Sequence, residues 1–210
     1  MSGDNDVEAL RGFVGSILSE VNTSMPGVIV SYDPATNLAV VRGLIPKKAT
    51  DGSVEECPQI VKVPISWPAG SGGHLTFPLA PGDGVNLHFS QRALDGWQAG
   101  TNAAPDDPRS YDLQDATAVP GTQVTGISAD PDAARLSFGG STVRLTKDGT
   151  VEHKTAGGTF TMDASGKFTV TAPGGFAVES PTFTHNGKNV GAEHKHLNVQ
   201  SGGGISGVPQ

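Results

Sequence analysis

The segment Thr142–Gly158, TVRLTKDGTVEHKTAGG, is followed directly by Thr159–Gly175, TFTMDASGKFTVTAPGG. Both units have 17 residues, begin with threonine, carry glycine at the eighth place and end in Gly-Gly. A third, degraded unit, FAVESPTFTHNGKNVGA, occupies residues 176–192. Each unit predicts two short strands joined by a turn at a Lys-Asp-Gly or Ser-Gly-Lys sequence. Short repeats of this kind indicate stacked β-structure, because one unit cannot bury its apolar side alone.

Apolar and polar residues alternate within the repeats, and we interpret His153 and His185 as outward polar residues. One copy of the chain would leave an apolar strip and unpaired strand edges exposed. Three copies wound about one axis would close this core. We therefore predict a homotrimeric intertwined β-helix or β-prism needle over residues 126–193. The apolar set comprises Val143, Leu145, Val151, Phe160, Met162, Phe168, Val170, Phe176 and Val178.

The composition of the whole chain favours many short strands over helices. Of 210 residues, 36% are hydrophobic, while 29 are glycine and 15 are proline. The net charge of −7 and the scattered lysines and arginines argue against a nucleic-acid partner. The single cysteine, Cys57, excludes an intrachain disulfide, fits a reducing compartment, and is interpreted as a small apolar residue. We recognise no signal peptide and no stretch of about 20 apolar residues that could span a membrane.

The N-terminal 24 residues predict the one good helix of the chain, over residues 6–22. Its apolar residues recur at three- and four-residue spacing. An apolar stripe of this kind is equally compatible with packing inside the chain and with docking to another chain. The helix could lie on its own domain, or it could dock with a partner or with sister subunits. The stripe comprises Val7, Leu10, Val14, Ile17, Leu18 and Val21.

Residues 25–100 predict a small mainly β barrel of the OB type. The β-rich runs are 28–32, 38–44, 60–66, 75–77 and 85–89, separated by turn sequences such as Pro81-Gly82-Asp83-Gly84. We interpret His74 and His88 as surface or hydrogen-bonded histidines. Residues 101–125 are polar and proline-bearing and predict an irregular linker. Four aspartates there lack the spacing of a calcium loop and are interpreted as turn and solvation groups: Asp106, Asp107, Asp112 and Asp115.

The last predicted segment, residues 194–210, begins with His194-Lys195-His196 and ends in a glycine-rich tail. Histidines at i and i+2 in an extended segment point to the same face. On a three-fold axis His194 and His196 would supply six imidazoles. That number suits an octahedral transition ion better than tetrahedral zinc, and such an ion would be structural. The alternative is an exposed tail that binds no metal.

The order of helix, barrel, β-repeat needle and terminal His-Lys-His resembles the central spike proteins of contractile phage tails, the baseplate assembly protein V and Gp138-type group. The segments at 26–33, PGVIVSYD, and 81–85, PGDGV, with Ser90-Gln91-Arg92 and Trp97, resemble the Gp138 N-terminal domain. The terminal motif and its tail, SGGGISGVPQ, are the more specific match.

The resemblance implies a virion protein, a homotrimer at the centre of the tail baseplate of a phage or a tailocin. Its implied partners are the baseplate hub protein and, transiently, the host outer membrane, which it pierces when the tail contracts. In the family an iron ion is held at the apex of the needle by three chains, which assigns the ligand role to His194 and His196 here. The chain has no room for the lysozyme domain of some relatives, so it is expected not to be an enzyme.

Two other functions compete with the spike. A non-haem metal enzyme would need Glu193 beside His194 and His196, but Glu193 adjoins His194 and would point to the opposite face. A receptor- or glycan-binding trimeric tail fibre would be expected to expose more aromatic side chains. Outside the phenylalanines, the chain offers only Trp67, Trp97, Tyr32 and Tyr111.

Overall fold

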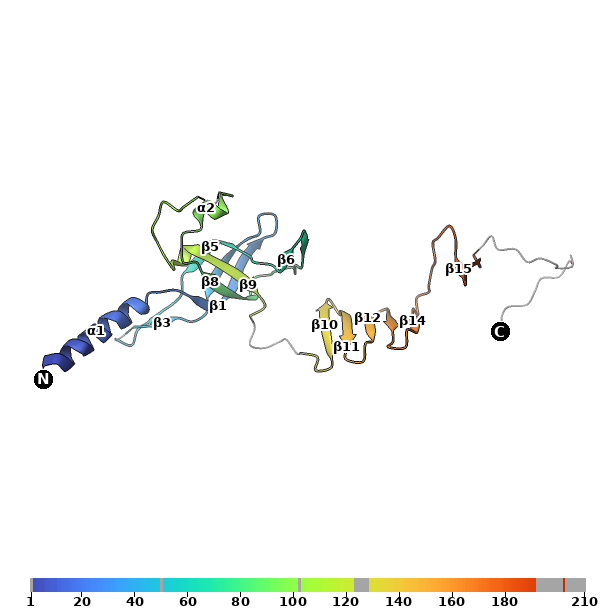
Figure 1. The fold of residues 1–210 in the computed structure, drawn as a ribbon, viewed down its shortest axis with the longest axis horizontal. Coiled ribbons are helices and arrows are strands. Elements are labelled where there is room, and N and C mark those ends of the chain that lie inside the picture. Colours follow the sequence, from blue (N-terminus) through green and yellow to red (C-terminus); the bar gives the residue numbers. More distant parts are fainter. Residues whose placement is uncertain (1, 50, 102, 123–128, 192–201, 203–210) are drawn as a thin grey trace. The chain divides into compact units, whose positions relative to one another are not determined.

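The computed structural model describes residues 2–49, 51–101, 103–122, 129–191 and 202. Contacts within the chain divide it into two compact units, with the division between residues 127 and 128 (Figure 1). The first unit holds helix α1 and a curled antiparallel sheet, and the second holds a separate antiparallel meander. The expectation of a mainly β chain with an N-terminal helix is confirmed.

Helix α1 covers Ser2–Leu18 and therefore lies closer to the N-terminus than the predicted range of 6–22. Every side chain from residue 6 to residue 18 is exposed. The apolar stripe is real, but no other described part of the chain covers it. Of the two uses open to the helix, packing on its own domain is not found among the described residues.

The main sheet of the first unit has five antiparallel strands. In spatial order they are β5 (Gln59–Pro64), β2 (Leu38–Gly43), β1 (Ser24–Asp33), β8 (Gly84–Phe89) and β9 (Ala116–Pro120). Two small hairpins and two short helices lie between these strands. They are β3 (Lys47–Lys48) with β4 (Val54–Glu55), β6 (Ala69–Gly70) with β7 (Gly73–His74), α2 (Asp95–Gln98), and the 3-10 helix η1 (Leu113–Asp115).

The sheet curls until its two edge strands meet. Two irregularities in the pairing are bulges that increase local twist: one in β1 between Ile29 and Ser31, opposite β2, and one in β5 between Ile60 and Val63, also opposite β2. A parallel bridge then joins Ile65 at the end of β5 to Ala118 of β9, and the Ser66 N–H donates to the Ala118 carbonyl over 2.8 Å. The prediction of an OB-like barrel is confirmed as a curled half-barrel of five strands.

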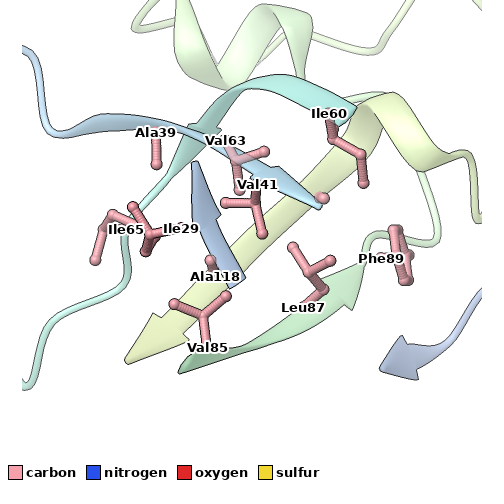
Figure 2. Close-up of a cluster of buried hydrophobic side chains, with 11 residues drawn as sticks. Ile29, Ala39, Val41, Ile60, Val63, Ile65, Val85, Leu87, Phe89 and Ala118 are labelled. Carbon is pink, nitrogen blue, oxygen red and sulfur yellow. The ribbon is translucent and has the colours of Figure 1, made fainter. Parts of the chain in front are cut away.

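The hollow side of this half-barrel holds the core of the first unit (Figure 2). Strands β2, β8 and β9 contribute alternate residues, as a strand with one buried face does, whereas the bulge in β5 separates its buried residues Ile60 and Val63 by three positions. Gly27 of β1 is required by this packing, because a Cβ there would lie 3.0 Å from Val41 and 3.1 Å from Leu87. The core residues are Ile29, Ala39, Val41, Ile60, Val63, Ile65, Val85, Leu87, Phe89, Ala116 and Ala118.

Two predictions about this unit are wrong. Residues 75–77 form no strand in the structure, and β9 lies within the predicted linker of residues 101–125. Strand β9 is short and contains two alanines and a proline, so its sequence carries little strand signal. It forms a strand because its backbone pairs with the edge of β8, where Val85 lies opposite Pro120 and Phe89 lies opposite Ala116.

The second unit is an antiparallel meander that follows the order of the chain. Its strands are β10 (Ala133–Phe138), β11 (Ser141–Thr146), β12 (Val151–Thr155), β13 (Gly158–Met162) and β14 (Phe168–Thr171). The eighth-place glycines of the first two repeats, Gly149 and Gly166, have φ of 87° and 85°. Glycine adopts this left-handed conformation without steric cost, which accounts for its recurrence.

The third repeat does not extend this sheet. Residues 176–183 contain no strand, and the unit ends in a separate hairpin of β15 (Thr184–His185) and β16 (Lys188–Asn189). The turn of this hairpin has positive φ at both Asn186 and Gly187. Asn-Gly in that conformation favours a tight hairpin. The third unit therefore contains the predicted pair of strands, but as a separate hairpin outside the sheet of β10 to β14.

Asp115 is the one buried charged residue of the described chain, with an exposed fraction of 1%. Its carboxylate accepts two hydrogen bonds from Arg109, one from Nε over 2.7 Å and one from Nη2 over 3.1 Å. It also accepts a hydrogen bond from the Leu94 N–H over 2.7 Å. Arg109 Nη1 donates to Asp107, and Nη2 also donates to Asp95. These carboxylates, Asp115 first, raise the pKa of the Arg109 guanidinium above its usual value. Asp115 is thus an ion-paired anchor, and its interpretation as a solvation group is wrong.

We predict that Asp115→Ala lowers the free energy of unfolding of the first unit by about 2 to 3 kcal/mol, because the Leu94 N–H and Arg109 lose their buried acceptor. Urea unfolding followed by tryptophan fluorescence measures this, since both tryptophans lie in the first unit. Asp107→Ala is the matched control, because Asp107 also binds Arg109 but is half exposed. Equal effects of the two variants would contradict the anchor role.

Candidate functional site

One face of the meander β10–β14 is apolar and exposed. Cross-strand partners share a face of a sheet. The antiparallel pairing therefore aligns the side chains of this face in two rows, each of which crosses all five strands. We call these rows the apolar face. One row is Leu136, Val143, His153, Phe160 and Val170, and the other is Ala134, Leu145, Val151, Met162 and Phe168.

The large side chains of the apolar face remain open to solvent in the single chain. Leu145 is 55% exposed, Phe160 46% and Phe168 53%. Phe160 and Phe168 meet edge to face, with ring centroids 4.5 Å apart and an interplanar angle of 84°. Soluble monomers rarely leave a contiguous apolar patch of this kind uncovered, and such patches mark interaction sites.

The opposite face of the same sheet is polar. Arg144 donates through Nε to Asp130 over 2.9 Å and lies 3.5 Å from Glu152 through Nη1. The pairing places Arg135, Arg144, Glu152, Thr161 and Thr169 in one row of this face. The Arg144 guanidinium, through its hydrogen bond, lowers the pKa of the Asp130 carboxyl. The two faces therefore differ as the buried and solvent faces of a sheet differ.

His153 lies on the apolar face, and its interpretation as an outward polar residue is wrong. Its partners across the sheet are Val143 on β11 and Phe160 on β13. It is the only ionisable side chain in the two rows. His185, by contrast, is exposed in the β15–β16 hairpin, as predicted. Any partner that covers the apolar face also covers His153.

The predicted metal ligands His194 and His196 lie outside the described residues, as does Glu193. Among the residues that the structure does describe, no group of three histidine, cysteine, aspartate or glutamate side chains could hold a metal ion. His88 is exposed and shares a hydrogen bond of 3.0 Å with Asn86, as expected of a surface histidine. The metal assignment accordingly stays a prediction for His194 and His196.

The first unit has open hollows on its surface. One of about 560 Å³ is lined by the segment between α1 and β1, by the start of β1, and by residues that include Gly43, Glu55, Glu56 and Cys57. No histidine lines it. The Cys57 thiol donates to the carbonyl of Ile45 over 3.1 Å, and a Cβ on Gly43 would lie 3.0 Å from its sulfur. Cys57 thus behaves as the small, half-buried packing residue that its sequence context indicates.

Tyr32 and Trp67 have packing roles. Asn37 Oδ1 accepts from Trp67 Nε1 over 2.9 Å and from Tyr32 Oη over 3.1 Å, and the Trp67 ring contacts Phe77. Trp97 is 56% exposed. Lectin-like binding uses exposed rings, and the aromatic cluster around Asn37 is instead held by its own chain.

In the described part of the chain, no helix has the length and apolar character needed to cross a membrane.

Comparison with known families gives one match. Residues 25–121 match the model described as the phage protein Gp138 N-terminal domain. The matched range begins in β1 and ends one residue after β9, so it contains all five strands of the half-barrel. It includes β9, which sequence reasoning had assigned to the linker. A comparison with curated proteins finds no match.

We predict that Phe160→Asp weakens self-association of the chain relative to the wild type, because each copy would then have to bury an unpaired carboxylate. Thr161→Asp is the matched control, since residue 161 is the next position along β13 and lies on the polar face. Sedimentation of the full chain measures both. Retention of the wild-type assembly by Phe160→Asp would show that the apolar face is not an interface between copies.

Proposed function

We propose, from the phage Gp138 N-terminal domain formed by residues 25–121, that this chain is the central spike of a contractile phage tail or tailocin. The match supports a structural protein of the phage tail or baseplate, and such families are typically non-enzymatic. The proposal adds that the protein lies on the axis of the tail and that it acts mechanically, by piercing the host outer membrane. It rests on the apolar face of β10–β14 more than on any other observation.

Three copies supply the simplest cover for this face. A sheet with one apolar and one polar face must place the apolar one against another surface. Related by a three-fold axis, three meanders can turn their apolar faces inward and their Arg144 faces outward. The shared core then resembles a β-prism or an intertwined β-helix, closed around the axis. Each chain contributes a third of a core that it could not form alone.

The proposed action is mechanical. A narrow trimer of paired strands is stiff along its axis, and contraction of the tail sheath would drive it into the host outer membrane. The outward face carries Arg144, Asp130 and Glu152, which remain hydrated and oppose adhesion to lipid. The first unit would remain at the baseplate and contact the hub protein, since residues 25–121 are the family domain. Energy for penetration comes from the tail and no chemical step is required.

The apex of the spike is assigned to residues 194–210, with an iron ion bound by His194 and His196 of three chains. Support for this assignment is the donor set, because neutral imidazole nitrogen suits iron and other first-row transition ions. A bound ion would hold three chain ends together at the point of greatest load. Structural metal sites contribute about 10 kcal/mol, enough to resist fraying.

A receptor- or glycan-binding tail fibre remains the second candidate, and a metal enzyme the third. The aromatic cluster around Asn37 is engaged within its own unit, which disfavours the fibre. The enzyme would need Glu193 beside His194 and His196, and adjacent residues of an extended segment point to opposite faces, which disfavours the enzyme. The spike and the fibre also differ in position, since only a spike lies on the tail axis.

We predict that gold-labelled antibody against this chain binds contractile particles at the tip of the tail axis. Electron microscopy of intact and contracted particles measures the position. Labelling at the periphery of the baseplate would contradict the spike and support the fibre. Antibody against the sheath protein of the same particle serves as the control for access of the label.

We predict that the purified chain carries one iron ion per three chains, and that His194→Ala and His196→Ala each remove it. Elemental analysis beside a mass measurement of the native assembly gives the ratio. His185→Ala is the control, since His185 is exposed in the β15–β16 hairpin. One ion per chain would support the enzyme, and retention of the ion by both variants would refute the ligand assignment.

A further inference from the structure

Helix α1 exposes an apolar stripe with the spacing of a coiled coil. Val7, Leu10, Val14 and Ile17 are separated by three, four and three residues. This is the a–d–a–d pattern of two heptads, in which a and d residues form the seam between helices. Their exposed fractions run from 46% to 63%, so the described part of their own chain does not cover them.

The helix also needs a partner to be stable. It has 17 residues, which is close to the lower limit for an isolated helix in water. Gly12 and Gly15 lie in its interior, and glycine there is less favourable than alanine. Apart from the helix's own backbone, no described atom lies within 4 Å of a Cβ added at either position, so packing against the rest of the described chain does not require these glycines. In the heptad they take positions f and b, which face away from the seam.

Positions e and g identify the partner as another copy of the same helix. In a parallel coiled coil, residue g of one helix faces residue e of the next heptad on its neighbour. Asp6 is at g and Arg11 at the following e, which gives an ion pair between copies. Phe13 at g and Leu18 at e likewise give an apolar pair. Both matches require helices that are parallel and in register.

We propose that α1 forms a parallel, in-register coiled coil with α1 of the other copies of this chain. Phe13 and Leu18 widen the apolar stripe beyond the a and d positions, which favours more than two strands. The number three is taken from the proposed function. After the helix, Asn22 Nδ2 donates to the Tyr111 carbonyl over 2.9 Å, so the chain leaves α1 at a fixed point of the first unit. Copies joined through their needles would thus present their helices at high local concentration.

Disulfide trapping in the full chain tests the proposal. Cys57 is the only cysteine, so Cys57→Ser gives a background without thiols. In that background, Leu10→Cys places a thiol at a d position, and Glu8→Cys places one at the outward b position. After mild oxidation of the assembled protein, we expect Leu10→Cys to form the interchain dimer in at least about fivefold higher yield than Glu8→Cys.

Sedimentation of the same samples separates the two proposals. If the chain is a monomer, the proposed function fails. If it is a trimer in which Leu10→Cys is not trapped above the Glu8→Cys level, only the coiled coil fails, and a helix that docks on the hub protein becomes the better account. Trapping of Leu10→Cys within a trimer supports both.

Charge exchange tests the direction and the register. In the Leu10→Cys background, Arg11→Asp places two carboxylates opposite each other and should lower the dimer yield about fivefold. Adding Asp6→Arg restores opposite charges between copies and should restore the yield. If the double variant stays as low as Arg11→Asp alone, the helices are not parallel and in register. High salt should weaken both effects, because exposed pairs are screened.

Discussion

The second unit depends on one constraint, that a single antiparallel sheet with an apolar and a polar face must cover the apolar one. Ten positions in two rows make up that face, and eight of them hold large apolar side chains. Phe160 and Phe168 already contact each other there, yet each keeps about half of its surface in solvent. The hydrophobic effect acts on this area regardless of which surface covers it. A three-fold assembly is the proposed cover because identical faces then bury one another around one axis.

The first unit solves the same problem within one chain. Bulges in β1 and β5 curl its sheet, the Ile65–Ala118 bridge joins the edges, and the apolar residues meet inside the curve. The buried Asp115, directly before β9, joins Arg109 and the Leu94 N–H and so ties together distant parts of the connection between β8 and β9. One unit therefore has a complete core, while the other contributes part of a core. Residues 25–121, which match the phage Gp138 N-terminal domain, thus form the unit with its own core, and the proposed assembly concerns the unit that lacks one.

Several features of the fold could be read from the residues, and others could not. The 17-residue period and the eighth-place glycines predicted β11 to β14, since Gly149 and Gly166 must adopt positive φ. Strand β9 was missed because its residues are small and its existence depends on the edge of β8. His153 was assigned to the polar face because histidine is a polar residue, although its position in the strand indicates the apolar face. It is two residues from Val151, so the period of a strand already placed both on one face. The predicted metal ligands His194 and His196 lie outside the described residues, so their role remains a prediction.

The sequence by itself determined the local periods: the apolar alternation of the repeats, the heptads of α1 and the turns at glycine. These depend on residues close together in the chain, where backbone geometry alone fixes the outcome. Only the tertiary structure decided which strands became neighbours, that Asp115 is buried against Arg109, and that the apolar face and α1 are left uncovered. Such outcomes depend on contacts between residues that are distant in the sequence. A local pattern does not indicate whether an apolar face packs against another part of the same chain.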